Sequence, residues 1–140
     1  MLTADQPDVA AFCECGVDAI ELARFRASYE RWGERLLRRV FTEREAARGR
    51  GRPDELAARF AAKEAISKAL GTGIRGVGWR EMEILSNARG KPFVRLHGGA
   101  AARASALGLT SWSVSLTHSD TVAIAMVVAC RVTLASAAIA

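Results

Sequence analysis

The feature that most restricts the fold is a long helix near the middle of the chain. Pro53 suits the first turn of a helix, because its missing N–H group would have no partner there, and Asp54 and Glu55 suit the positive end of the helix dipole. The helix is predicted to run to about residue 70 and to stop at the sequence Gly-Thr-Gly, since glycine readily adopts the left-handed conformation that ends helices. The remaining segments must therefore pack around one central helix.

Those other segments alternate irregularly between helix and strand. A capping box, with Thr42 at the cap and Glu45 three residues later, starts one helix. Further helices are predicted at residues 20–29, 34–40 and 98–107, and strands at residues 12–18, 79–86, 92–96, 111–118 and 121–130, with the last two forming a hairpin. The sequence predicts an α+β fold, a single domain at residues 12–130 whose mostly antiparallel sheet packs on the long helix. Residues 1–11 are expected to be a flexible leader and residues 131–140 a short tail.

The chain is basic, with a net charge of +5, and arginine supplies seventeen of its twenty basic groups. Such a surface suits an anionic partner: a nucleic acid, a phosphorylated small molecule or an acidic protein. The longest apolar run, near residues 122–130, is far too short to span a bilayer, and the first residues lack the pattern of a signal peptide. We therefore expect a cytoplasmic protein with no membrane partner.

The three cysteines give no sign of a metal or redox motif. Cys13 and Cys15 flank a single residue, which is the wrong spacing for a CxxC motif. In a strand both would point to the same side of the sheet. We expect them to be two small apolar residues on a buried face.

Glu64 and Lys68 lie four residues apart on the long helix, so they share one face. In one interpretation they form an ordinary surface ion pair, worth about 0.2–0.5 kcal/mol, and the glycines simply end the helix. In the other, an acid, an ammonium group and a glycine turn hold a metal ion and phosphate oxygens side by side. Asp18, at the end of the first predicted strand, would supply the second carboxylate of an Mg²⁺ site. Taken alone, the helix favours the first interpretation.

Five ordered segments resemble one known family. They are Gly16-Val17-Asp18 with Arg24 six residues after the aspartate, Phe41-Thr42-Glu43-Arg44-Glu45, the run RFAAKEAISKALGTG at residues 59–73, Gly90-Lys91-Pro92, and Ser115-Leu116-Thr117-His118. In this order they match the holo-[acyl-carrier-protein] synthases, the small, single-domain type of 4′-phosphopantetheinyl transferase. The resemblance spans about residues 12–128 and implies that family's fold.

The resemblance implies a reaction in which phosphopantetheine passes from coenzyme A to a serine hydroxyl of a carrier protein and 3′,5′-ADP leaves. By matching position, Asp18 and Glu64 would bind Mg²⁺, and Lys68 would contact the phosphates and stabilise the leaving group. His118 would lie near the coenzyme, so Glu64, Lys68 and His118 are the expected catalytic residues. Either Glu64 or a water on the metal would deprotonate the serine.

The resemblance also implies binding residues and partners. The coenzyme A site is expected to be lined by Arg59, Lys68, Gly71, Thr72, Gly73, Lys91, Pro92, Ser115 and His118. Arg24 would meet the acidic recognition helix of the acyl carrier protein, which gives the positive charge a purpose because both substrates are anionic. Members of the family are usually homotrimers with sites between subunits. The carrier protein could serve fatty acid biosynthesis, or a polyketide or peptide assembly line.

Two other functions compete with this one. A small nucleic-acid-binding domain would explain the charge, but it would not explain the acids at Asp18 and Glu64, and the aromatic residues form no stacking run. A relative that binds carrier proteins without modifying them would have no need to keep both acids and Lys68. The sequence therefore favours the enzyme.

Overall fold

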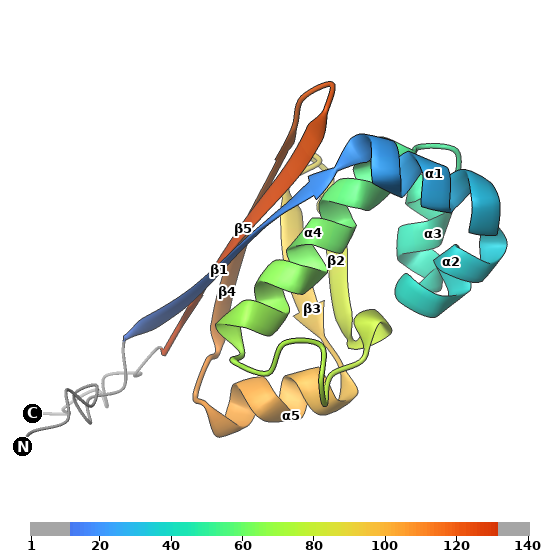
Figure 1. Cartoon of the computed structure of the whole chain (residues 1–140). Helices are drawn as coiled ribbons and strands as arrows, with labels where there is room; N and C mark the ends of the chain where they lie inside the picture. Colours follow the sequence, from blue (N-terminus) through green and yellow to red (C-terminus); the bar gives the residue numbers. More distant parts are fainter. Residues whose placement is uncertain (1–11, 132–140) are drawn as a thin grey trace, which may run out of the picture.

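The computed structural model describes residues 12–131 (Figure 1). Its strands are β1 (Cys13–Glu21), β2 (Met82–Ser86), β3 (Pro92–Leu96), β4 (Ser111–His118) and β5 (Val122–Cys130). Its helices are α1 (Leu22–Trp32), α2 (Glu34–Val40), α3 (Glu43–Gly49), α4 (Pro53–Ala69) and α5 (Gly98–Ala106), with a short 3-10 turn, η1, at Trp79–Glu81. The predicted leader and all of the predicted tail except its first residue lie outside the described residues.

Two antiparallel ladders pack around α4. One sheet has the strand order β1-β5-β4, and β2 pairs with β3 in a second ladder that lies beside β4. Helix α4 crosses the inner face of the larger sheet, while α1, α2 and α3 gather near its first residues and α5 lies near its last (Figure 1). The helix fits closely because β5 turns only small, fully buried side chains towards it: Ala123, Ala125, Val127 and Ala129. The predicted α+β class, with an antiparallel sheet on a long helix, is confirmed.

Three predicted elements differ from the structure by more than one residue. Strand β1 does not end at Asp18 but continues to Glu21, because Ile20 still pairs with Ala123 of β5. Helix α1 consequently begins at Leu22 and runs to Trp32. The predicted strand at residues 79–86 keeps only its second part, since its first three residues form the turn η1. Within residues 12–131, no helix is long and apolar enough to cross a membrane.

Strand β1 and helix α4 are in close contact at Gly16. A Cβ atom added to this residue would lie 1.9 Å from the backbone carbonyl oxygen of Ala65, so no side chain fits there. Ala61 and Ala65 are fully buried on the facing side of the helix. The close packing of β1 on α4 therefore requires glycine at position 16. Because Asp18 follows two residues later on the same strand, this packing also sets its distance from α4.

Replacing Gly16 with alanine should separate β1 from α4 and destabilise the protein. Because the clash is with backbone, no rotamer change can relieve it, and we expect the upper end of the usual cost of overpacking, about 3 kcal/mol. Gly78→Ala is the control, since the atoms nearest to a Cβ there belong to the flexible Glu81 side chain, at 3.4 Å. Urea denaturation of both variants measures the difference. Equal midpoints for Gly16→Ala and Gly78→Ala would contradict the close packing.

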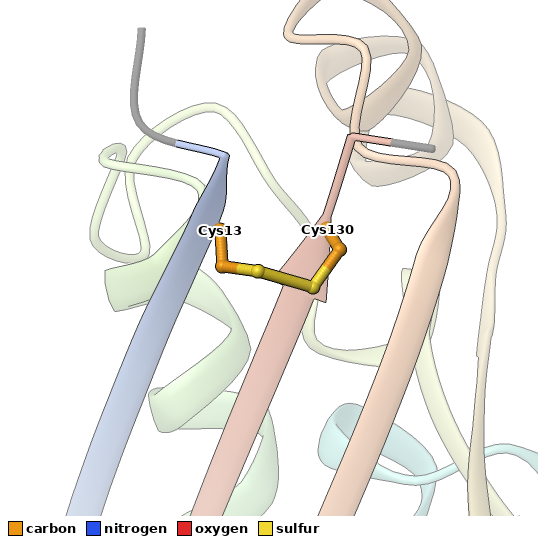
Figure 2. Close-up of a disulfide and its surroundings, with 2 residues drawn as sticks. All are labelled: Cys13 and Cys130. Atoms are coloured by element: carbon orange, nitrogen blue, oxygen red, sulfur yellow. A yellow bond between two sulfur atoms is a disulfide. The ribbon is translucent and has the colours of Figure 1, made fainter. Parts of the chain in front are cut away.

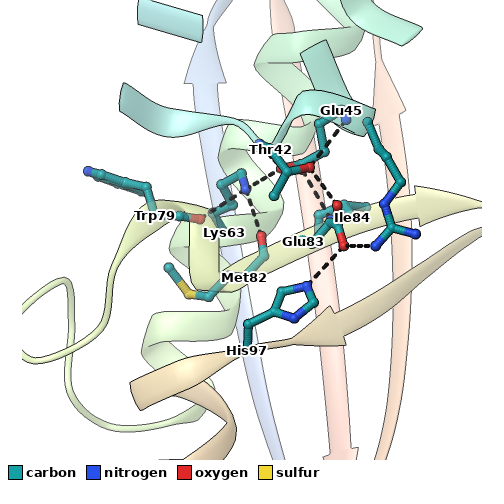
Figure 3. A network of polar contacts seen from close by, with 9 residues as sticks. Thr42, Glu45, Lys63, Trp79, Met82, Glu83, Ile84 and His97 are labelled. Atoms are coloured by element: carbon teal, nitrogen blue, oxygen red, sulfur yellow. Dashed lines mark hydrogen bonds and ion pairs between the residues drawn. The ribbon is translucent and has the colours of Figure 1, made fainter. Parts of the chain in front are cut away.

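A buried ion pair joins α3 and α4 to the start of β2 (Figure 3). The Nζ atom of Lys63 donates to Glu45 Oε1 at 2.7 Å, to the carbonyl oxygen of Met82 at 2.7 Å and to that of Trp79 at 3.0 Å. Both charged side chains are fully buried, and Glu45 Oε2 accepts from the N–H of Ile84 at 3.1 Å. Burial lowers the pKa of Lys63, and the Glu45 carboxylate opposes that shift. All three donor positions of the ammonium group are therefore satisfied.

Glu83 is the second buried acid in this region. Its carboxylate accepts from the Thr42 hydroxyl, from Arg44 Nη2 at 2.8 Å and from His97 Nε2 at 3.0 Å (Figure 3). Burial alone would raise the pKa of Glu83, but the hydrogen bonds from Thr42 and His97 and the charge of Arg44 together lower it. The ionised form is therefore the one that the fold stabilises.

This lowered pKa predicts a pH dependence of stability. Because the pKa of Glu83 is lower in the folded than in the unfolded chain, its contribution is complete above the unfolded value of about 4.3 and is lost as the pH falls through the folded value. We expect wild type to be more stable than Glu83→Gln at neutral pH, and the difference in stability to shrink as the pH falls below the unfolded value. Denaturation of both proteins across this range measures it. A gap that stays constant with pH would be inconsistent with an ionised Glu83.

A disulfide connects the two ends of the domain (Figure 2). Cys13 and Cys130 face each other in the β1–β5 ladder with their Cα atoms 4.2 Å apart, although 117 residues separate them in the sequence. Cys15 is a free thiol and is exposed. The expectation of two apolar cysteines on a buried face was therefore wrong: both point to the outer face of the sheet, away from α4.

Candidate active site

Asp18 and Lys68 meet across the contact between β1 and α4. Lys68 Nζ lies 3.2 Å from Asp18 Oδ1 and also donates to the carbonyl oxygen of Val17 at 2.9 Å. Among the described residues, this is the ion pair that Lys68 forms, rather than the predicted one with Glu64 one turn earlier. The interpretation of Glu64 and Lys68 as an ordinary surface ion pair is therefore wrong.

Glu64 is left as an acid close to a second acid. Partial burial raises the pKa of Glu64, the negative charge of Asp18 raises it further, and Lys68 partly offsets both effects. Two carboxylates that repel each other at one point favour a divalent cation between them, and Mg²⁺ typically takes one or two carboxylates with water and phosphate oxygens. Within residues 12–131, no cluster of three or more His, Cys, Asp or Glu side chains could hold a metal. The donor set of Asp18 and Glu64 fits Mg²⁺ completed by substrate phosphates.

The Gly-Thr-Gly sequence ends α4 just beyond Lys68. Gly71 and Gly73 have φ angles of 73° and 56°, a region that other residues rarely adopt. The N–H of Thr72 donates to the carbonyl oxygen of Ser67 at 3.3 Å, and Arg103 Nε donates to that of Leu70 at 3.1 Å. The turn thus closes the helix in the predicted way, and Arg103 from α5 braces it.

A cleft of about 400 Å³ opens on another side of α4. It lies between the first half of α4, the end of α3, the β2–β3 turn and β4. Five of the predicted coenzyme-binding residues line it together: Arg59, Lys91, Pro92, Ser115 and His118. Arg59 is only 6% exposed, and its guanidinium donates to Ser86 Oγ at 3.1 Å and to the carbonyl oxygen of Glu55 at 3.4 Å. The cleft is therefore a preformed, positively charged site.

The two groups of residues lie on different sides of one helix. Arg59 and Glu64 are five residues apart on α4, which corresponds to about 140° around the helix axis. Arg59 and Gly71 are separated by about 18 Å along that axis. The structure therefore divides the predicted site residues into two half-sites: an acidic half with Asp18, Glu64 and Lys68 next to the glycine turn, and a basic half formed by the cleft.

Comparison with known proteins identifies the family. Residues 14–127 match the model of the 4′-phosphopantetheinyl transferase superfamily. The chain belongs to this superfamily. A holo-[acyl-carrier-protein] synthase of Herpetosiphon aurantiacus is 52% identical over 120 residues, which cover 81% of this chain and 94% of the relative.

Solved structures of the superfamily have the same fold. The holo-[acyl-carrier-protein] synthase of Helicobacter pylori, in complex with coenzyme A, has a TM-score of 0.75 and 28% identity, covering 82% of this chain and 98% of that one. The enzyme of Bacillus anthracis, in complex with coenzyme A (3′,5′-ADP), has a TM-score of 0.70 and 31% identity, with coverages of 85% and 96%. This chain is thus an enzyme of the transferase superfamily with the matching α+β fold.

Sequence reasoning missed several residues of this transferase's basic cleft. Arg48, Glu55, Ser86 and Thr117 also line it. Arg48 and Glu55 belong to no motif and are distinguished only by their position on the ends of α3 and α4. Glu55 lies one turn before Arg59 on α4, and folding brings Arg48 of α3 into the same cleft.

Arg24 lies apart from both half-sites, on the exposed side of α1. It lines a groove of about 400 Å³ between the end of β1, α1, α2 and α4. Apolar side chains form the floor of this groove: Ile20, Phe25, Leu36 and Phe60. Phe60 is one turn before Glu64 on α4, so the groove begins beside the acidic half-site of the transferase.

Proposed function

We propose that this chain is a holo-[acyl-carrier-protein] synthase that transfers 4′-phosphopantetheine from coenzyme A to a serine of an apo acyl carrier protein, with Mg²⁺, releasing 3′,5′-ADP. The observation that carries the proposal is the placement of Asp18 and Glu64 beside Lys68 at the contact of β1 and α4. The names of the relatives and the coenzyme A complexes of two similar structures support it.

Each half-site has its own part in the reaction. Mg²⁺, held by Asp18 and Glu64, would neutralise charge on the pyrophosphate as its bond breaks. Lys68 Nζ donates to a phosphate oxygen and stabilises the leaving group. Either Glu64 or a water on the metal takes the proton of the attacking serine. In the cleft, Arg59, Lys91 and His118 hold and orient the coenzyme.

The arrangement of the half-sites favours a trimer. One coenzyme cannot easily contact both sides of α4 in a single chain, whereas the acidic half of one copy and the basic half of the next can enclose it. The outer face of the larger sheet exposes Val17 (58%), Met126 (50%) and Ile124 (37%), an apolar surface suited to contact between copies. Light scattering tests the mass. Mixing Asp18→Asn with Lys91→Gln protein should restore activity above that of either variant, because mixed trimers contain an intact site.

The partners follow from the charges of the surface. Arg24 and the groove beside it receive the acidic carrier protein, with the serine delivered next to Glu64. The proposal places the reaction in the cytoplasm and requires neither a membrane nor a nucleic acid. Rates with apo carriers from fatty acid, polyketide and peptide synthesis would identify the client.

The direct test incubates the purified protein with coenzyme A, Mg²⁺ and several apo carrier proteins. Intact-mass spectrometry should show the gain of one phosphopantetheine on a carrier and release of 3′,5′-ADP. Chelation of the metal should abolish the gain. Carrier binding without any mass gain would overturn the proposal in favour of a non-catalytic relative.

A further inference from the structure

The basic cleft contains an arginine, Arg48, whose side chain forms no stabilising polar contact within residues 12–131. Arg48 lies in the last turn of α3, is exposed and lines the cleft. No hydrogen bond or ion pair joins its side chain to another residue between 12 and 131. It nevertheless lies close enough to Arg59 to affect it: burial lowers the pKa of Arg59, Glu55 opposes that shift and Arg48 adds to it. Two like charges held together without a shared partner indicate an anionic ligand.

The same cleft contains two buried polar atoms that are unsatisfied within the described residues. They are Nε of Arg59, a donor, and Oε2 of Glu55, an acceptor. The two side chains are one turn apart on α4, so they lie side by side along the wall of the cleft. Buried polar atoms are normally paired, so both indicate a ligand that offers an acceptor next to a donor.

A ribose bearing a phosphate monoester on C3 offers this pair of groups. Its phosphate is a dianion that two guanidinium groups can bind at once, and the 2′-hydroxyl on the adjacent carbon is a donor. The nucleotide end of coenzyme A is such a group, whereas its pyrophosphate belongs to the acidic half-site under the proposed function.

We propose that Arg48 and Glu55 make this transferase selective for the 3′-phosphoribose of its coenzyme. Arg48 binds the 3′-phosphate together with Arg59, and Glu55 accepts a hydrogen bond from the 2′-hydroxyl. This proposal rests on the proposed function but concerns two side chains that none of the family's motifs contains.

The first test measures binding of 3′,5′-ADP and 5′-AMP by calorimetry, without a carrier protein. In Arg48→Gln, affinity for 3′,5′-ADP should fall at least about tenfold while that for 5′-AMP changes less than about twofold, since only the first ligand carries the phosphate. Arg48→Lys should recover part of the loss. Arg38→Gln, on α2, removes the same charge outside the cleft and should leave both affinities unchanged.

The second test separates the roles of Glu55. If Glu55 only offset the positive charge, Glu55→Gln would bind 3′,5′-ADP more tightly than wild type. If it accepts from the 2′-hydroxyl, wild type should bind the 2′-deoxy analogue about tenfold more weakly than the ribose form, and Glu55→Gln should narrow that difference. In Arg48→Gln the KM for coenzyme A should rise, as the affinity for 3′,5′-ADP falls, whereas the KM for 3′-dephospho-coenzyme A should change little. The kcat values should change little with either substrate.

The outcomes separate the two proposals. Suppose that wild type binds 3′,5′-ADP. If Arg48→Gln then weakens the binding of both nucleotides equally, or leaves both affinities unchanged, the role of Arg48 is overturned and the proposed function is not. Wild type that binds neither coenzyme A nor 3′,5′-ADP overturns the proposed function as well.

Discussion

Asp18→Asn and Glu64→Gln should each reduce phosphopantetheine transfer by at least about a hundredfold, the cost of removing a principal electrostatic contact from a transition state. Each substitution keeps the shape of the side chain and removes one of the two charges that would hold Mg²⁺. Asp18→Asn also leaves Lys68 without its ion pair, which releases the ammonium group. The fold should survive, because neither side chain belongs to the core.

Rates measured by intact-mass spectrometry over a range of Mg²⁺ concentrations test this prediction. The half-saturating concentration of Mg²⁺ should rise in both variants. Glu43→Gln is the matched control, since Glu43 is an exposed acid in the first turn of α3 and takes no part in either half-site. If Asp18→Asn or Glu64→Gln has an activity within a few-fold of this control, Asp18 and Glu64 are not the residues that bind Mg²⁺.

Lys63→Met should destabilise the protein by about 3–5 kcal/mol, the cost of breaking a buried ion pair by removing one partner. Methionine nearly fills the space of the lysine, so little cavity forms and the loss is electrostatic. Glu45 then remains as an uncompensated charge in the core, and the carbonyl oxygens of Trp79 and Met82 lose their shared donor. Chemical denaturation measures the loss.

The double variant Lys63→Met with Glu45→Gln provides the control. Glutamine carries no charge, and its single side-chain oxygen can keep one of the two hydrogen bonds that Glu45 Oε1 and Oε2 accept from the N–H groups of Thr42 and Ile84. Because replacing a whole buried pair costs less than breaking it, the double variant should be more stable than Lys63→Met. A double variant less stable than Lys63→Met would indicate that the Glu45 hydrogen bonds, rather than its charge, dominate.

Local chemistry was sufficient to predict most elements of the fold. Pro53 and Gly71 mark the two ends of α4, and the capping box of Thr42 and Glu45 starts α3 as expected. Strands β3 and β4 begin and end at the predicted residues. The extension of β1 was not predictable, because residues 19–21 continue as strand only through pairing with Val122–Ile124 of β5, a partner about a hundred residues away.

The candidate site was less accessible to sequence reasoning. The helical spacing of Glu64 and Lys68 indicated a pair, yet Lys68 bonds to Asp18, 50 residues distant, once Gly16 lets β1 approach α4. The five residues of the cleft came only from the resemblance to a family. No sequence pattern marks Arg48 and Glu55 as site residues. The unpaired charge of Arg48 in the cleft and the unsatisfied oxygen of Glu55 are features of the folded chain alone.

The pairing of Cys13 with Cys130 brings the entry and the exit of the domain to one point, with 4.2 Å between the two Cα atoms. A folded unit whose chain enters and leaves at one point can be inserted into a loop of another protein without stretching its host. The same geometry makes the domain a covalently closed ring when oxidised, so a single protease cut between these cysteines releases no fragment. On a non-reducing gel such a nicked protein runs as one band, and adding a reductant separates it into two.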